Sequence, residues 1–253
     1  MRVLKNILGR IYAVWMLVWF VITILLVSIP VVICHYTIRN DTRRTYAIMK
    51  WYRIWMDVYL PLIFCPIRKK GLSNFHPGEN YVVVCNHNAL VDILVSTPSV
   101  PGASKTLAKA ELARIPVFGL VYKSGSILVD RKDPKSRRKS LDAMKKVLRE
   151  GMHLVLYPEG TRNKTSEPLK SFYDGAFNIA IEAQKPIIPA LIFHTKSILP
   201  PGKFFYAWPH AIPIHFLEPV STEGLTTRDT SRLKEQVFRI MQEYYVKNSP
   251  HTR

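Results

Sequence analysis

The stretch that decides the fold is YVVVCNHNALVD, residues 81–92. It opens on a short apolar run, Tyr81 to Cys85, which predicts a buried strand, and an imidazole and a carboxylate follow that run directly. His87 and Asp92 are five positions apart, which on one continuous helix is a rotation of about 140°. The two side chains can therefore meet only if His87 lies in a turn and Asp92 in the first turn of the next helix.

This pair has two interpretations. A neutral imidazole accepts a proton near pH 7, and a carboxylate on its other ring nitrogen would fix the tautomer and stabilise the imidazolium. Alternatively, His87 is a loop histidine with satisfied hydrogen bonds, and Asp92 is favoured at a helix start by the helix dipole. The stretch by itself favours the structural interpretation, so the remaining chain must decide.

Short apolar runs alternate with helical patterns from Tyr81 onward. The expected strands are Tyr81–Cys85, Ser126–Val129, His153–Tyr157, Ile187–Phe193 and Ile212–Phe216. The expected helices are Val91–Thr97, Pro116–Lys123, Pro134–Glu150, Gly175–Ala183 and Thr227–Val246. This alternation predicts an α/β fold with a mixed, largely parallel sheet flanked by helices.

The expected helix at 134–150 has the clearest local signals. Asp133 suits its N-cap, and Leu141, Met144 and Leu148 form one apolar stripe at helical spacing. Its remaining surface is basic. That surface is either a solvated helix face or a face that contacts anionic lipid headgroups.

Residues 11–38 contain no Asp, Glu, Lys or Arg. As a helix, the part from residue 11 to residue 34 would be about 36 Å long, against a bilayer core of about 30 Å. The run is too long for the apolar part of a signal peptide, and we expect Pro30 to kink or end the helix. Basic residues flank the run on both sides, so a spanning helix and one that enters the membrane and returns both stay open.

The next stretch, residues 46–65, mixes aromatic and basic residues and suits an amphipathic helix at the headgroup level. We therefore predict a hydrophobic two-helix membrane anchor over residues 1–66. Residues 68–71 would form a basic linker, and residues 67–253 the α/β domain.

Composition limits the partners and the chemistry. A net charge of +18 favours nucleic acid, anionic lipid or anionic small molecules as partners. The three cysteines are far apart and have no metal-binding spacing, which indicates buried thiols in a reducing compartment. No His-Glu-x-x-His pattern occurs either, so the sequence predicts no metal site.

Arginines follow two of the expected strands. Arg131 comes directly after one, and the segment Glu159-Gly160-Thr161-Arg162 comes after another. The carboxyl ends of strands in α/β sheets are where ligands bind, glycine lets the backbone approach a ligand closely, and arginine offers a planar fork of donors to phosphate. Singly, each arginine is more often a surface ion-pair partner. Together with His87 they indicate an anionic acceptor beside a general base.

These blocks, in this order, resemble the lysophosphatidic acid acyltransferases, the PlsC-type glycerolipid acyltransferases of membranes. The resemblance covers roughly residues 80–192. Its motifs match at Asn86, His87 and Asp92; at Lys109, Glu111, Leu112, Pro116 and Gly119; at Gly125 and Leu128 to Arg131; at Glu159 to Arg162; and at Pro186 to Pro189.

The resemblance implies the role of each residue. His87 would be the general base on the acceptor hydroxyl, and Asp92 would orient it. The acceptor phosphate would be bound by Arg131 and Arg162 in a site shaped by Glu159, Gly160 and Thr161, with Asn86 and Lys109 as possible supporting residues. The acyl donor would be a thioester of coenzyme A or of acyl carrier protein, with no bound cofactor and no nucleic-acid partner.

The implied reaction is acyl transfer to 1-acyl-glycerol-3-phosphate, giving phosphatidic acid, at a membrane. The expected location is the bacterial inner membrane, with the catalytic domain on the cytoplasmic face. Two positions depart from the family pattern. Ala89 stands where many members have serine, and Tyr173 stands where a lysine is usual, so Lys164 or Lys170 would have to supply the cation.

Three alternatives stay open. The acceptor could be another lysolipid. The pair His87 and Asp92 could activate water, which would make the protein a hydrolase. A non-catalytic basic protein bound to the membrane surface would explain the net charge but not the His/Asp and Glu-Gly-Thr-Arg blocks.

Overall fold

The apolar run of the deciding stretch forms the central strand β2 (Val82–Cys85) of the computed structural model, which describes residues 2–130 and 132–249. All four side chains of β2 are buried, because successive residues of a strand point to opposite faces and both faces of this sheet are covered. Val82 and Val84 belong to the apolar cluster on one face, and Val83 and Cys85 to the cluster on the other.

The sheet has seven strands in the order β1-β7-β6-β2-β5-β3-β4. The other strands are β1 (Ile67–Lys70), β3 (Ser104–Lys109), β4 (Ser126–Val129), β5 (His153–Leu156), β6 (Ile187–Ile192) and β7 (Ile212–Phe216). Every neighbouring pair is parallel except β6 and β7, which are antiparallel. The predicted mixed, largely parallel sheet is confirmed.

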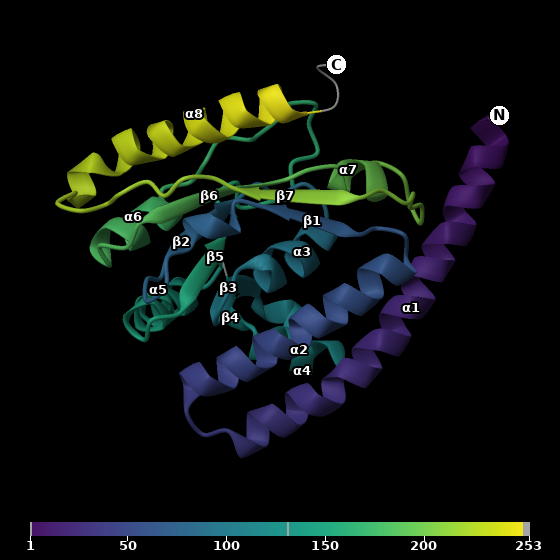
Figure 1. Cartoon of the computed structure of the whole chain (residues 1–253), viewed down its shortest axis with the longest axis horizontal. Coiled ribbons are helices and arrows are strands. Elements are labelled where there is room, and N and C mark those ends of the chain that lie inside the picture. Colours follow the sequence, from purple (N-terminus) through teal and green to yellow (C-terminus); the bar gives the residue numbers. More distant parts are fainter. Residues whose placement is uncertain (1, 131, 250–253) are drawn as a thin grey trace.

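Helices cover both faces of this sheet (Figure 1). One face carries α1 (Arg2–Thr37), α2 (Asp41–Leu62), α3 (Val91–Ser99) and α4 (Phe118–Ser124). The other face carries α5 (Pro134–Arg149), α6 (Gly175–Glu182) and α8 (Thr230–Asn248). Short helical segments at Leu72–Asn74, Ala110–Arg114, α7 (Thr195–Ile198) and Thr227–Asp229 complete the described elements.

The sequence did not predict two of the strands, β1 and β3. The predicted basic linker is wrong, because residues 67–70 form the edge strand β1 and pair with β7. The charged side chains of Arg68, Lys69 and Lys70 are exposed there, which hinders pairing with a further strand. The strand β3 was missed because Ser104, Lys105 and Thr106 make its sequence polar.

The apolar stripe predicted for α5 is partly wrong. Met144 and Leu148 are buried, but Leu141 is exposed. The buried face of α5 consists of Ser140, Met144, Val147 and Leu148. The N-cap is as predicted, since the Asp133 carboxylate accepts hydrogen bonds from the first turn of the helix.

The two N-terminal helices form an antiparallel pair. Trp55 of α2 donates from its indole nitrogen to the Thr23 hydroxyl of α1 over 2.8 Å, and the Tyr59 hydroxyl donates to the Met16 carbonyl over 3.3 Å. The helix α1 does not end at Pro30 but continues to Thr37. Among the described residues it is the one helix long and apolar enough to cross a membrane, and most of its large apolar side chains are exposed.

Three aromatic side chains of α2 face the protein interior. Tyr52, Trp55 and Tyr59 are buried in the apolar cluster shared with α1 and the sheet, and the position of the helix at the headgroup level stays a prediction. Trp51 is exposed. The buried face of α2 belongs to the same apolar cluster as β2 and β7, so the core continues across the predicted domain boundary at residues 66 and 67. The boundary itself remains a prediction.

Candidate active site

The turn between β2 and α3 brings His87 and Asp92 together. Asp92 lies in the first turn of α3, fully buried, and its Oδ2 atom is 2.8 Å from Nδ1 of His87. The same oxygen accepts hydrogen bonds from the backbone N–H groups of Asn88 at 2.5 Å and Ala89 at 2.7 Å. The backbone of the turn therefore surrounds the carboxylate. His87 lies in the turn and Asp92 in the first turn of α3, which is the arrangement that the spacing of five residues predicts.

This hydrogen bond determines the tautomer of His87. A carboxylate is an acceptor only, so Nδ1 of His87 carries the proton and donates it to Asp92. The other ring nitrogen, Nε2, then has its lone pair available. His87 is partly exposed whereas Asp92 is not. The arrangement therefore presents a basic nitrogen on one side of the ring and fixes the ring from the other.

Tyr157 forms one wall of the imidazole site, a role the sequence did not reveal. Its ring centroid is 4.4 Å from that of His87, with 31° between the two planes. Its hydroxyl is hydrogen-bonded to the Ser96 hydroxyl of α3 over 2.6 Å. Burial raises the pKa of Tyr157 well above its ordinary value, so the hydroxyl stays neutral and holds the ring in place.

Glu159 holds two loops to the histidine turn. Its Oε1 accepts from the backbone N–H of His87 at 2.8 Å, and its Oε2 accepts from the backbone N–H of Lys170 at 3.1 Å. The side chain is almost completely buried, and burial raises its pKa although both hydrogen bonds act in the opposite direction. Because backbone groups engage both of its oxygens, Glu159 shapes the site from within.

Two asparagines complete this framework. The backbone N–H of Asn163 donates to the His87 carbonyl at 2.6 Å, which ties the loop after β5 to the loop after β2. The buried Asn86 amide pairs with the backbone of Ile192, donating to its carbonyl at 3.0 Å and accepting from its N–H at 2.7 Å. Asn86 thus extends the pairing of β2 with β6 and supports the turn.

The segment Gly160–Arg162 directly follows Glu159, and its last two residues are exposed. Gly160 has a positive φ of 68°, and a Cβ atom there would come within 2.8 Å of the Tyr173 ring, so glycine is favoured at this position. The Lys170 ammonium donates to the Thr161 hydroxyl over 2.7 Å. Arg162 is exposed. Lysine, threonine and arginine side chains therefore gather on one short loop.

Lys196, on α7, is a further cation that sequence reasoning missed. Its ammonium group donates to the carbonyls of Thr165 at 3.0 Å and Glu167 at 3.4 Å. Burial lowers its pKa, while the carboxylates of Glu159 and Asp92 act to raise it. Lys196 thus lies within electrostatic range of the site, and no sequence motif marked it.

The remaining predicted residues follow other strands. The strands β2, β5, β3 and β4 are parallel, so their carboxyl ends lie at one edge of the sheet. Lys109 ends β3 at this edge, is exposed, and forms a loose ion pair with Glu111 at 3.7 Å. Arg131 lies outside the described residues, so its predicted role stays a prediction.

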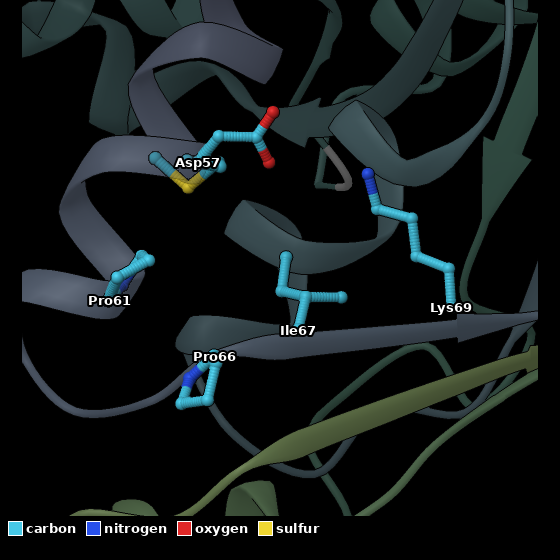
Figure 2. A pocket seen from close by; sticks show the side chains of 6 residues that line it. Asp57, Pro61, Pro66, Ile67 and Lys69 are labelled. Atoms are coloured by element: carbon cyan, nitrogen blue, oxygen red, sulfur yellow. The ribbon is translucent and has the colours of Figure 1, made fainter.

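A hollow of about 350 Å³ lies elsewhere, between α2 and β1. Figure 2 shows Asp57 and Lys69 beside it, together with Pro61, Pro66 and Ile67. It contains none of the residues around His87, and in the sheet β1 is separated from β2 by two strands. Among the described residues no group of three or more His, Cys, Asp or Glu side chains is placed to hold a metal ion.

Comparison with known proteins places this geometry in context. A family model described as Acyltransferase matches residues 66–193. The 1-acyl-sn-glycerol-3-phosphate acyltransferase alpha of Mus musculus is 32% identical over 173 residues, which is 68% of this chain and 60% of the mouse protein. The 1-acyl-sn-glycerol-3-phosphate acyltransferase of Saccharomyces cerevisiae is 29% identical over 163 residues, which is 62% of this chain and 52% of the yeast protein.

The chain thus spans about 60% of the length of the curated relatives it matches first. Among solved structures, that of the 1-acyl-sn-glycerophosphate (LPA) acyltransferase PlsC from Thermotoga maritima has a TM-score of 0.75. The alignment covers 98% of this chain and 97% of that one, at 21% sequence identity. The fold is therefore shared with that structure over nearly the whole chain.

Proposed function

Because this chain belongs to the acyltransferase family, we propose that it transfers a fatty acyl group from a thioester to the free hydroxyl of 1-acyl-glycerol-3-phosphate, which gives phosphatidic acid. The observation that carries this proposal is the 2.8 Å hydrogen bond between Asp92 and Nδ1 of His87, which directs the basic Nε2 to a substrate. The names of the curated relatives and of the solved PlsC structure support this choice of acceptor.

The proposed reaction is direct transfer. Nε2 of His87 removes the proton from the acceptor hydroxyl as its oxygen attacks the thioester carbonyl carbon, and Asp92 stabilises the imidazolium that forms. The carbon–sulfur bond then breaks, and the thiolate leaves and takes up the proton. A thiol has a pKa near 8.5, so the leaving group needs no strong general acid. Cys85 is buried in β2, and burial raises its pKa, so it is no nucleophile in this scheme.

We assign the acceptor phosphate to the loop that carries Arg162. The Lys170 ammonium donates a hydrogen bond to the Thr161 hydroxyl there. It supplies the cation that is missing at position 173, where this chain has tyrosine. Arginine and lysine together suit a phosphate dianion, by bidentate hydrogen bonds and by charge. Arg131 is proposed to join them. Glu159 is proposed as a positioning residue, because its oxygens bind the backbone.

The donor and the location complete the proposal. The thioester is one of coenzyme A or acyl carrier protein, both anionic, which the basic surface of the chain favours. The acceptor is a membrane lipid, and α1 is the element that attaches the protein to the bilayer. The cytoplasmic face of a bacterial inner membrane remains the predicted location.

The proposal is tested with the full chain in detergent, lysophosphatidate and a long-chain acyl-coenzyme A. Replacement of His87 by alanine should lower kcat by about 10²–10⁴-fold, the usual contribution of a general base. His76→Ala is the matched control, because His76 is an exposed histidine that contacts only Glu79 among the ion pairs of the described residues. Near-normal transfer by His87→Ala would refute the mechanism. Thioester loss at the full rate without acceptor would indicate a hydrolase.

A further inference from the structure

The loop between α7 and β7, residues 199–211, is held against the N-terminal turns of α1. The Tyr206 ring packs so closely on Gly9 that a Cβ atom there would lie 2.1 Å from it. The backbone N–H of Ala207 donates to the Gly9 carbonyl over 3.1 Å. Gly9 is buried by this contact although its neighbours along α1 are exposed. The α7–β7 loop and the first turns of α1 therefore form one continuous surface.

The tip of this loop exposes two adjacent phenylalanines to solvent. Phe204 is 88% exposed and Phe205 is 43% exposed. Phe205 also has a φ of 46°, in the left-handed region that disfavours a bulky side chain. Two adjacent exposed phenylalanines are unusual on a surface that faces only water. They become favourable when the tip enters an apolar phase.

Two lysines flank a hollow beside this tip. The hollow has a volume of about 420 Å³, and Tyr206, Trp208 and His210 also line it. The Lys5 ammonium lies 5.3 Å from the Trp208 ring centroid, and the Lys203 ammonium lies 4.1 Å from the Tyr206 ring centroid. The faces of the two rings thus orient one cation from α1 and one from the loop.

The two chain segments that line this hollow carry no acidic residues to neutralise its lysines. Residues 1–40 contain no Asp or Glu, and neither do residues 183–217. Lysines over aromatic rings, next to exposed phenylalanines, are the combination that suits the boundary between headgroups and acyl chains. The exposed apolar side chains of α1, among them Leu4, Leu8 and Ile11, begin directly beside it.

We propose that the α7–β7 loop is a second membrane contact, in which Phe204 enters the bilayer and Lys5 and Lys203 together bind the phosphate of an anionic phospholipid. This contact goes beyond the acyl-transfer site, because it concerns how the protein is held on its membrane. It rests on the proposed attachment through α1. The ligand is the phosphate of a lipid in a bilayer, because binding of a free phosphate ion would leave the phenylalanines in water.

The test measures the depth of position 204 in a bilayer. The full chain, with Phe204→Cys carrying a nitroxide, is reconstituted in vesicles of phosphatidylcholine alone or mixed with phosphatidylglycerol. The background is Cys34→Ser, because Cys34 is partly accessible whereas Cys65 and Cys85 are buried. A second label at Glu243→Cys, on α8 across the sheet, reports the water-exposed side.

In the mixed vesicles the label at 204 should be reached by dissolved oxygen and shielded from a water-soluble nickel chelate, whereas the label at 243 should show the reverse. Lys5→Gln combined with Lys203→Gln should weaken the preference for phosphatidylglycerol roughly 25-fold, because each lysine near an anionic surface contributes about a fivefold factor. The pair Lys234→Gln and Lys247→Gln on α8 removes the same charge elsewhere and should leave the preference unchanged.

Three results would overturn the inference. The label at 204 could be as exposed to water as the label at 243. Its immersion could be independent of phosphatidylglycerol and of both lysines. Inorganic phosphate could bind the detergent-solubilised protein in a manner that requires Lys5 and Lys203, which would assign the hollow to a soluble anion. Acyl transfer in detergent should be unaffected by the two lysine changes, so failure of the proposed activity would leave this test intact.

Discussion

At the scale of single residues, Asp92 acts on His87 through one oxygen atom. That oxygen accepts from the imidazole and from two backbone N–H groups. In Asp92→Asn only one amide atom can take the place of this oxygen. The amide oxygen there would keep the three hydrogen bonds but lack the charge that stabilises the imidazolium, whereas the amide nitrogen would lose both backbone hydrogen bonds and force the proton onto Nε2. Either orientation weakens proton removal by His87.

We therefore expect Asp92→Asn to lower kcat by about 10²–10⁴-fold while KM for both substrates changes little. The measurement is steady-state kinetics in detergent. Asp57 of α2 lies outside this site, at the hollow between α2 and β1, and Asp57→Asn therefore provides a control of equal chemistry. A variant that loses stability in proportion to its activity would instead show that Asp92 serves the fold.

Arg162 provides the corresponding test of substrate binding. We expect Arg162→Ala to raise KM for lysophosphatidate, with a loss in kcat/KM on the order of 10²-fold, because a charge-assisted contact to phosphate contributes about 1.5–3 kcal/mol. A lysolipid acceptor without a terminal phosphate monoester should show a much smaller loss. Equal losses for both acceptors would exclude a phosphate role. Arg228→Ala, a basic residue beside α8, serves as the control.

At the scale of elements, the sheet carries a buried histidine that makes stability depend on pH. His153 begins β5, and its Nδ1 atom accepts from the backbone N–H of Tyr81 at 3.2 Å. Burial lowers its pKa to about 4, and the charge of Arg53 acts in the same direction. In the unfolded chain the ordinary pKa is about 6.5. Between these values the unfolded state binds more protons, so stability falls as pH falls.

We expect the native chain to lose about 2–3 kcal/mol of unfolding free energy through this group between pH 7 and pH 4.5. In His153→Asn the amide oxygen can replace the ring acceptor, so this part of the pH dependence should disappear, whatever the overall stability. Thermal unfolding in detergent at both pH values measures it. The exposed His76, changed to Asn, should keep the native slope. An unchanged slope in His153→Asn would show that the histidine titrates normally.

The sequence predicted elements well where burial determines residue type. Each of the five expected strands and five expected helices occurs, with bounds that differ by a few residues. β1 and β3 were missed because both are rich in polar residues. Strand β3 alternates buried and half-buried positions, and its Thr106 hydroxyl donates to the Val155 carbonyl of β5. Such a strand is stabilised by its neighbours, which periodicity alone does not reveal.

The residues of the candidate site were likewise predicted only in part. The turn that joins His87 and Asp92 followed from their spacing, and it is present. Tyr157 and Lys196 could not be found in this way, because their contacts to the site come from distant parts of the chain. Glu159 was expected to shape the phosphate site, and its oxygens accept hydrogen bonds from backbone N–H groups. Such backbone partners cannot be read from the residue type alone.

At the scale of the whole molecule, the predicted anchor and domain share one core. The α2 residues Ile48, Met49, Met56 and Leu60 are buried, as are three aromatic residues of the same helix. Each fully buried apolar side chain contributes about 1.5–3 kcal/mol. Together they contribute on the order of 10 kcal/mol, as much as the whole stability of a typical domain.

We therefore expect two truncations to behave differently. Removal of residues 1–39, which deletes α1, should give a folded but destabilised protein that no longer floats with vesicles. Removal of residues 1–66 should give a chain that does not fold, because the face of the sheet under α2 is opened. Circular dichroism and vesicle flotation distinguish the two. A folded, active domain from residue 67 onward would show that α2 is dispensable.

The long-range ties of the histidine turn also set an order of events during synthesis. Asn86 pairs with a residue 106 positions later, and His87 is held by a residue 72 positions later. At about 5–20 residues per second, the ribosome reaches the partner of Asn86 roughly 5–20 s after Asn86 itself. The apolar helix α1 is complete long before that. Under the proposed mechanism, a nascent chain therefore exposes the apolar helix α1 before the proposed base is held in place, and a prematurely released fragment lacks the residues that hold it.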